Sequence, residues 1–383
     1  MIPPEVKSQH LFVLVGGNPL PNYVAIRLLR RDGAHVYLVH TPQTTLIADR
    51  ICQVAGLVLG KDATKILVKA GDARGMRQAV SRFAKGKPAL GLNYTGGTKH
   101  MALHVFQGMV VANPHVTLSY LDADALSLRI EQGEENTQDW PVSLALQLTF
   151  QDLLTLHGHK VQSIEKELIC PEVYRSLPDA PYEQWGEWWG RASRGMSGKT
   201  GDILLPTEAA FDPIRPYFGA ATTVGELANQ WGASVSDLSK WFGEAGLESY
   251  VLWSMREVAA EAQLVETAKN VMPQGIKFEF DVVAMRGYQL FAVSCANNRD
   301  KGKAKLKLME AYVRSRQMGG DEARVAVVCR IPPHDAESNP KLIEREMAEQ
   351  LGVEGKIRIF GAEHLLRCPS ICWHGSRLDD ADR

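Results

Sequence analysis

Residues 89–101 read Ala-Leu-Gly-Leu-Asn-Tyr-Thr-Gly-Gly-Thr-Lys-His-Met, and this stretch decides how the first part of the chain is interpreted. Its apolar start predicts a buried strand, and the apolar positions from Met101 onward predict a helix. The Gly96-Gly97 turn between them lets a ligand approach the backbone, while a helix N-terminus offers free N–H groups to an anion. Polar side chains flank the turn, at Asn93, Thr95, Thr98 and Lys99. We therefore predict a phosphate-facing site.

The same alternation of short apolar runs and helical segments continues on both sides of this stretch. Strands are predicted at residues 11–15, 35–39, 66–68, 89–92 and 116–121. Helices with short loops between strands are typical of a parallel, doubly wound α/β sheet, whose ligand crevice lies beyond the strand carboxyl ends. Three loops qualify, and their candidate ligand-binding residues are Gly16, Gly17, Asn18, Pro19, Thr41, Asn93, Thr95, Gly96, Gly97, Thr98 and Lys99. Their spacing matches neither a Walker A loop nor a dinucleotide fingerprint.

Composition narrows the class of protein. With 383 residues the chain is expected to form two or three domains. Its net charge of -1 means that any nucleic-acid contact depends on local basic patches. The six cysteines are scattered, which favours reduced thiols in a cytoplasmic protein. No signal-peptide pattern and no apolar run of membrane-spanning length is found in this sequence, so no membrane association is expected.

The middle of the chain carries weaker signals. Residues 131–139 are interpreted as a polar linker, and residues 142–157 as a helix. Residues 222–242 predict two short helices with a turn at Gly232. This pair could be a helix-turn-helix, but helical hairpins more commonly serve as packing units, and we interpret it as structural.

A clear pattern returns after Gly246. A helix is predicted at residues 247–262, a β-hairpin at 276–295, a helix at 305–316, a strand at 324–329, a helix at 341–351 and a strand at 356–360. Helix, β-hairpin, helix and strand is the order of elements in a restriction-endonuclease-like fold. We accordingly divide the chain into residues 1–130, a linker and helical connecting region at 131–245, and a second α/β domain at 246–383.

Two carboxylates in this second half are suited to holding Mg²⁺ or Mn²⁺. Glu248 lies at the start of the predicted helix and Asp281 lies in the first hairpin strand, with Ser294 on the second strand. Metal-dependent phosphodiester cleavage uses such carboxylates, usually with a lysine near the attacking water. The competing interpretation is that Glu248 is an exposed residue of a helix start and Asp281 a surface carboxylate.

These motifs carry a family resemblance. The stretch Asn93-x-Thr95-Gly96-Gly97-Thr98-Lys99, with the Gly16–Pro19 loop, resembles a CARF domain, the cyclic-oligoadenylate sensor of type III CRISPR systems. The second half is similar to the PD-(D/E)xK nuclease domain of the Card/Can ancillary nucleases. Leu247-Glu248-Ser249-Tyr250-Val251 resembles the helix motif of that family, and Glu279-Phe280-Asp281-Val282 its strand motif. The resemblance implies that Glu248 and Asp281 bind metal, and that Ser294 and Ala296 lie at catalytic positions.

One residue departs from the family pattern. Ala296 stands where the family has a lysine, so activation of water should be weak. One explanation is an inactivated variant, with alanine put in place of lysine; the match around Cys295-Ala296-Asn297 favours it. The other is a naturally degenerate protein that uses a displaced lysine or only binds. The displaced candidates are Lys301, Lys303 and Lys305.

The resemblance implies a cyclic-oligoadenylate-activated, metal-dependent nuclease that cleaves DNA, RNA or both as a type III CRISPR antiviral effector. Cyclic tetra-adenylate is the expected activator, and a ring with two-fold symmetry suits a homodimer. The alternative is a ligand-sensing module whose degenerate nuclease domain binds nucleic acid or a protein without cleavage.

Overall fold

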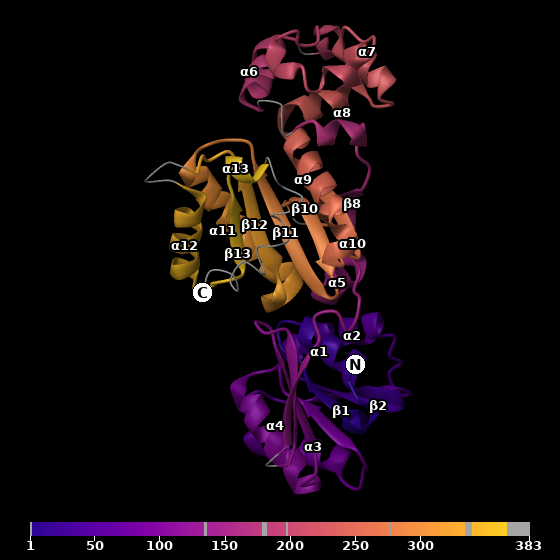
Figure 1. Cartoon of the computed structure of the whole chain (residues 1–383). Coiled ribbons are helices and arrows are strands. Elements are labelled where there is room, and N and C mark those ends of the chain that lie inside the picture. The colour runs from indigo at the N-terminus through magenta and orange to yellow at the C-terminus, as the bar shows by residue number, and fades with distance from the viewer. Residues whose placement is uncertain are drawn as a thin grey trace.

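The computed structural model describes residues 2–133, 136–177, 182–196, 198–275, 277–333 and 339–365. Two β-sheets form the two main bodies of the molecule, and a group of helices, α6 to α8, caps the far end of the second sheet (Figure 1). Helix α9 descends from that group along the second sheet. The mixed α/β architecture with two sheets agrees with the expected fold class.

The first sheet has seven strands in the order β3-β2-β1-β4-β5-β6-β7. Its first five strands are parallel, and β6 and β7 extend it as an antiparallel hairpin. The strands are Ser8–Leu14 (β1), Arg30–His40 (β2), Ala63–Leu67 (β3), Leu90–Asn93 (β4), Thr117–Asp122 (β5), Ser127–Gln132 (β6) and Asn136–Pro141 (β7). The expected linker at 131–139 is therefore wrong for the described residues 131–132 and 136–139, because cross-strand pairing with β5 and β6 holds them in the sheet.

Helices cover both faces of this sheet. They are Leu20–Leu29 (α1), Thr45–Ala55 (α2), Ala73–Ala84 (α3) and Lys99–Ala112 (α4). The apolar sides of α3 and α4 bury Met76, Val80, Met101 and Val105 against β1 and β4. The side chain of Thr98 caps α4 by accepting a hydrogen bond from the Met101 N–H, which fixes where the helix begins after the glycine turn.

The second sheet has six strands in the order β13-β12-β11-β10-β9-β8. They are Val161–Glu165 (β8), Glu266–Pro273 (β9), Phe280–Arg286 (β10), Gln289–Ala296 (β11), Arg324–Cys329 (β12) and Ile357–Phe360 (β13). Strands β8 to β11 are antiparallel, and β11 to β13 are parallel. The sequence predicts β10 to β13 but not β8 and β9. Strand β8 pairs with β9 about a hundred residues later, and that pairing is not visible in local periodicity; β9 also pairs with β10, which follows it directly.

The remaining helices are Phe150–His157 (α5), Tyr182–Ala192 (α6), Val224–Gln230 (α7), Val235–Lys240 (α8), Gly246–Glu257 (α9), Ala259–Ala262 (α10), Lys301–Gly319 (α11), Pro340–Leu351 (α12) and Ala362–Leu365 (α13). The two short helices around Gly232 are confirmed as α7 and α8. The helix expected from residue 142 begins only at Phe150, where Thr149 caps it. Within the described residues no helix is both long and apolar enough to cross a membrane.

One apolar core joins the two sheets. The α1 and α2 face of the first sheet, α5 and one face of the second sheet contribute to the same cluster, which includes Leu20, Ile51, Leu153, Met285 and Leu290. A second cluster lies on the opposite face of the second sheet, where α9 meets the tryptophans of the capping helices. The two main bodies therefore share buried apolar surface.

The turn between β10 and β11 is fixed by close contact at this junction. Gly287 has a positive φ of 59°, its carbonyl accepts a hydrogen bond from the Leu148 N–H at 2.9 Å, and a Cβ there would overlap the Ser143 carbonyl oxygen. Gly275 has a φ of 79° with open space around its Cβ position.

Replacing Gly287 with alanine should therefore destabilise the protein more than replacing Gly275. Both substitutions carry the left-handed backbone cost of about 1–2 kcal/mol, and Gly287→Ala adds an overlap cost of about 1–3 kcal/mol. Urea denaturation of the two variants measures the difference. Equal free energies of unfolding would contradict the tight docking of this turn.

Candidate functional sites

The first candidate site is a pocket of about 230 Å³ at the carboxyl ends of the parallel strands β1 and β4. It brings together six of the predicted ligand residues, which are Gly16, Gly17, Asn18, Thr95, Gly96 and Gly97. Its other lining residues are Pro21, Tyr120, Leu121, Ala123, Asp321 and Glu322. A pocket beyond the strand carboxyl ends is where an open α/β sheet binds its ligands.

Glycine is required where the two loops of this pocket meet. A Cβ on Gly16 would lie 2.7 Å from the Gly97 nitrogen, and a Cβ on Gly96 would overlap the Leu14 carbonyl oxygen. Gly97 has a positive φ of 76°. The loops after β1 and β4 therefore touch through their backbones, and the resulting wall presents peptide groups rather than side chains.

The structure places the other predicted ligand residues away from this wall. Asn93 is fully buried and its Nδ2 donates to Ser119 Oγ at 3.1 Å. Lys99 is exposed at the start of α4, and Thr98 acts as its N-cap. Thr41 is buried, and Pro19 is the N-cap residue of α1. Of the non-glycine loop residues that the sequence predicts as ligands, Asn18 and Thr95 line the pocket.

The sequence does not predict the part of the pocket lining that β5 and the second body contribute. Tyr120, Leu121 and Ala123 lie in or just after β5, and Asp321 and Glu322 belong to a 3-10 helix, η9 (Gly320–Glu322), that follows α11. The predicted strand at residues 116–121 could have indicated the β5 residues, because its carboxyl end lies at the same edge of the sheet as those of β1 and β4. No local signal connects Glu322 with a loop three hundred residues earlier.

The second candidate site lies on the second sheet around Asp281. This residue is in β10, opposite Ser294 in β11, and its Oδ2 accepts hydrogen bonds from Ser294 Oγ at 2.9 Å and from the Cys295 N–H at 2.7 Å. The ammonium group of Lys307, on α11, lies 3.5 Å from the same oxygen. These contacts fix the orientation of the Asp281 carboxylate.

Glu248 faces this carboxylate from the first turn of α9. Burial, together with the negative charge of Asp281, raises the pKa of Glu248 to about 7. The pKa of Glu279, two residues before Asp281, is raised by burial and by the same neighbour. The negative charge of Asp281 thus disfavours ionisation of both glutamates, and a bound cation would relieve this repulsion.

A lysine reaches the site although position 296 holds a buried alanine. The Lys307 Nζ donates to the Cys295 carbonyl at 2.8 Å in addition to its contact with Asp281. Of the displaced lysines expected from the sequence, Lys305 is paired with Glu346, and Lys303 is exposed on the first turn of α11. The lysine of this basic segment that contacts the site is therefore Lys307, since helical spacing decides which side chain points toward β11.

The donors suit a hard divalent cation with few protein ligands. No group of three or more His, Cys, Asp or Glu side chains is arranged for metal binding among the residues that the structure describes. Mg²⁺ is commonly held by one or two carboxylates, with water and substrate phosphates completing its shell. Glu248 and Asp281 meet that requirement, because they supply two neighbouring carboxylates.

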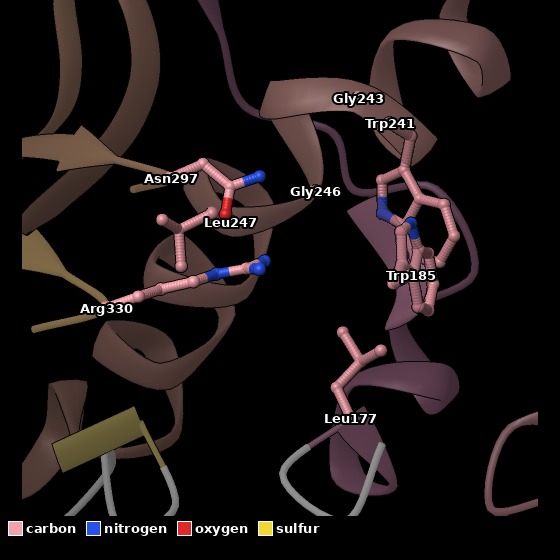
Figure 2. A pocket seen from close by; sticks show the side chains of 8 residues that line it. All are labelled: Leu177, Trp185, Trp241, Gly243, Gly246, Leu247, Asn297 and Arg330. Carbon is pink, nitrogen blue, oxygen red and sulfur yellow. The ribbon is translucent and has the colours of Figure 1, made fainter. Parts of the chain in front are cut away.

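A cavity of about 10 Å³ lies beside this site, at the start of α9 (Figure 2). The side chains of Asn297 and Arg330 extend toward Leu247 from one side, and Trp241 and Trp185 close the other. Trp185 donates from its indole Nε1 to the Phe242 carbonyl at 3.0 Å. A cavity of this size has room for about one water molecule. The aromatic cluster therefore packs closely against the start of α9, the helix that carries Glu248.

Glu248→Gln should change how stability depends on pH. The pKa of Glu248 is raised in the folded protein, so the folded state favours the protonated carboxyl. The contribution of this group to the free energy of unfolding is therefore full below the ordinary pKa of 4.5 and is lost as pH rises through about 7. In metal-free buffer the variant should be about as stable as the wild type at pH 5 and more stable by roughly 2–3 kcal/mol at pH 8. Thermal unfolding of both proteins at the two pH values measures this. A constant difference between them would contradict the buried, Asp281-facing placement.

Comparison with known proteins identifies the fold. No family model and no curated protein sequence matches the chain. Among solved structures, protein VC1899 from Vibrio cholerae is 15% identical with a TM-score of 0.71, covering 96% of this chain and 99% of that one. Can2 from Sulfobacillus thermosulfidooxidans, solved in complex with cyclic tetra-adenylate, is 18% identical with a TM-score of 0.67, covering 96% and 98%.

A third structure is described as a type III CRISPR defence DNA nuclease activated by cyclic oligoadenylate. It is 18% identical with a TM-score of 0.52, and the match covers 87% of this chain and 47% of that chain. The first two matches extend over nearly the whole of both chains and therefore include both sheets. The chain thus shares its fold with VC1899 and with Can2 over both sheets, in agreement with the fold that the sequence resemblance implied.

Proposed function

We propose that the chain is a cyclic-oligoadenylate-activated, metal-dependent nuclease of type III CRISPR defence, acting on DNA, RNA or both. The observation that carries the proposal is the presence, in one chain, of a glycine-lined pocket at the strand ends of the first sheet and a Glu248–Asp281–Lys307 cluster on the second. Similarity in fold to Can2 bound to cyclic tetra-adenylate supports the choice of ligand.

The first pocket suits a phosphodiester ring. Its wall presents the backbone of Gly16, Gly17, Gly96 and Gly97, which an anion can approach without meeting a Cβ. Helix α4 begins two residues after Gly97, so the positive end of its dipole lies near the phosphate-facing loop. Lys99, exposed at that helix start, would add positive charge at the rim.

The second site suits hydrolysis of a phosphodiester. A divalent cation held by Glu248 and Asp281 would polarise the phosphate and lower the pKa of an attacking water. Ser294 and the Cys295 N–H keep Asp281 in one orientation, and Lys307 places a positive charge where charge develops on the phosphate oxygens. In this arrangement Lys307 supplies the positive charge that a lysine at position 296 would supply.

A homodimer is part of the proposal. A two-fold symmetric ring is matched by an isologous interface. Apolar side chains are exposed on two helices, namely Leu103, Phe106 and Val111 on α4 and Leu306, Met309 and Val313 on α11. Burial of such residues is the ordinary driving force of association, and both helices adjoin the proposed sites.

The alternative is a sensor that binds without cleaving. The alanine at position 296, where the family that the sequence resembles has a lysine, favours it. The two functions differ in one measurable property, which is cleavage in the presence of ring and metal.

The test combines binding and cleavage. Isothermal titration with cyclic tetra-adenylate and cyclic hexa-adenylate should give tight binding of one of them at one ring per two chains. Supercoiled plasmid and single-stranded RNA are then incubated with the protein, Mn²⁺ and that ring; cleavage of either supports the nuclease. Binding without cleavage would support the sensor, and no heat with either ring would contradict both.

Lys307→Met should lower the ring-activated cleavage rate by about a hundred-fold, because one positive charge at the developing oxyanion is lost. Lys303→Met is the matched control, since it removes the same charge from the exposed side of the same helix. Initial rates under saturating ring and metal are compared. Similar rates for the two variants would show that Lys307 takes no part in cleavage.

A further inference from the structure

The ligand pocket of the first body has a wall made by the second body. Glu322, in η9, lies beside the loop that follows β1, and its Oε2 accepts a hydrogen bond from Asn18 Nδ2 at 3.4 Å. Asn18 also accepts from the Leu20 N–H at 3.1 Å, so this one side chain connects the start of α1 to the second body. Both Asn18 and Glu322 line the pocket.

Glu322 is a buried carboxyl with unused hydrogen-bonding capacity. Its side chain is fully inaccessible, and Oε1 has no hydrogen-bond partner among the residues described by the structure. Burial raises the pKa of Glu322 to about 7. A buried carboxyl with one unpartnered oxygen is costly, and the Asn18 amide is its hydrogen-bond partner in the first body.

The approach between the two bodies at this point depends on two glycines. Gly320 has a φ of 70°, and a Cβ there would overlap the Asn18 side-chain amide. A Cβ on Gly319 would lie 2.9 Å from the Leu290 side chain in β11. The turn is thus packed between the ligand loop and the second sheet.

Helix α11 connects this turn to the second site. It runs from Lys301 to Gly319, about 28 Å at 1.5 Å per residue, and it carries Lys307 against Asp281 near one end. Its other end leads directly into Gly320 and Glu322. One continuous helix therefore joins η9 to the contact with Asp281.

The charges around η9 favour an orientation of the ligand. Asp321 is paired with Arg316, and Lys356 donates from Nζ to the Asp321 carbonyl at 3.2 Å and pairs with Asp124 at 2.6 Å. The glycine loops present backbone groups, while the half-exposed Asp321 contributes the carboxylate of the η9 part of the lining and Glu322 lies buried behind Asn18. Phosphates would face the glycines, and hydroxyl or amino donors of the nucleoside would face Asp321.

We propose that the ligand pocket is a composite site in which Glu322 of the second body is a ligand-sensing residue, coupled through Asn18 and α11 to the position of Lys307. The proposal rests on the proposed function above. Occupancy of the pocket displaces Asn18 relative to Glu322, η9 moves with it, and α11 adjusts the Lys307–Asp281 contact. The second body thereby responds to the ligand within a single protomer.

The test compares Glu322→Leu with the wild type in the full-length protein. Leucine removes the acceptor without leaving a buried charge. The variant is expected to bind cyclic tetra-adenylate in isothermal titration, but its activation, the cleavage rate with ring divided by the rate without it, should fall at least ten-fold. Hydrogen exchange supplies a readout besides activity: ring binding should alter exchange of amides 301–322 in the wild type and not in the variant.

Asp124→Asn is the matched control. It weakens another polar contact between the two bodies, the pair with Lys356, without touching Asn18, and should keep both the activation and the exchange response. Asn18→Ala, which removes the other partner of the bond, replaces Glu322→Leu if thermal unfolding shows that the latter does not fold. Full activation and an unchanged exchange response in the variant would overturn the coupling. Absence of ring binding by the wild type would instead overturn the proposed function.

Discussion

The apolar core shared by the two sheets is the constraint on which the rest of the structure depends. The α1 and α2 face of the first sheet buries its side chains together with α5 and one face of the second sheet, so neither body has a complete core of its own on that side. Apolar burial is worth about 25 cal/mol per Å², and it holds the loop after β1 within hydrogen-bond distance of η9. The glycines at the contact follow from that closeness, because a side chain there would separate the bodies.

Much of the fold is predictable from the sequence because its strands and helices carry local signals. The parallel strands of the first sheet are apolar runs, and the capping residues Thr98 and Thr149 mark where helices begin. Strands β7 and β8 are polar and largely exposed, so their pairing depends on distant neighbours and not on their own pattern. Nothing in the local sequence of β8 indicates that it pairs with β9, which follows it by about a hundred residues.

The candidate sites, too, are predictable from the sequence only in part. Asp281 and Ser294 meet because antiparallel register is fixed by a two-residue turn, and that much follows from the hairpin prediction. The Lys307 contact does not, because it requires the exact rotation of α11 on the sheet. In the first pocket the glycine loops were identifiable by composition, while Asn93 has the expected residue type but satisfies a buried neighbour, Ser119. A polar residue in a loop motif serves packing as readily as binding.

In the described part of the chain, three buried polar atoms without partners lie where the two bodies meet. Glu322 Oε1, Tyr288 Oη and His157 Nε2 are buried with no hydrogen-bond partner among the described residues, and burial lowers the pKa of His157 to about 4. Each such group costs about 1–3 kcal/mol, which an apolar replacement would avoid. His157 and Asn18 line a second pocket of about 400 Å³ that adjoins α11 on the other side of the Asn18–Gly320 contact. A junction that combines a large apolar core with unsatisfied polar groups and open space is held together firmly but packed incompletely. The coupling proposed above requires two arrangements of this junction with similar free energies, because a ligand shifts an equilibrium by no more than its difference in affinity for the two states.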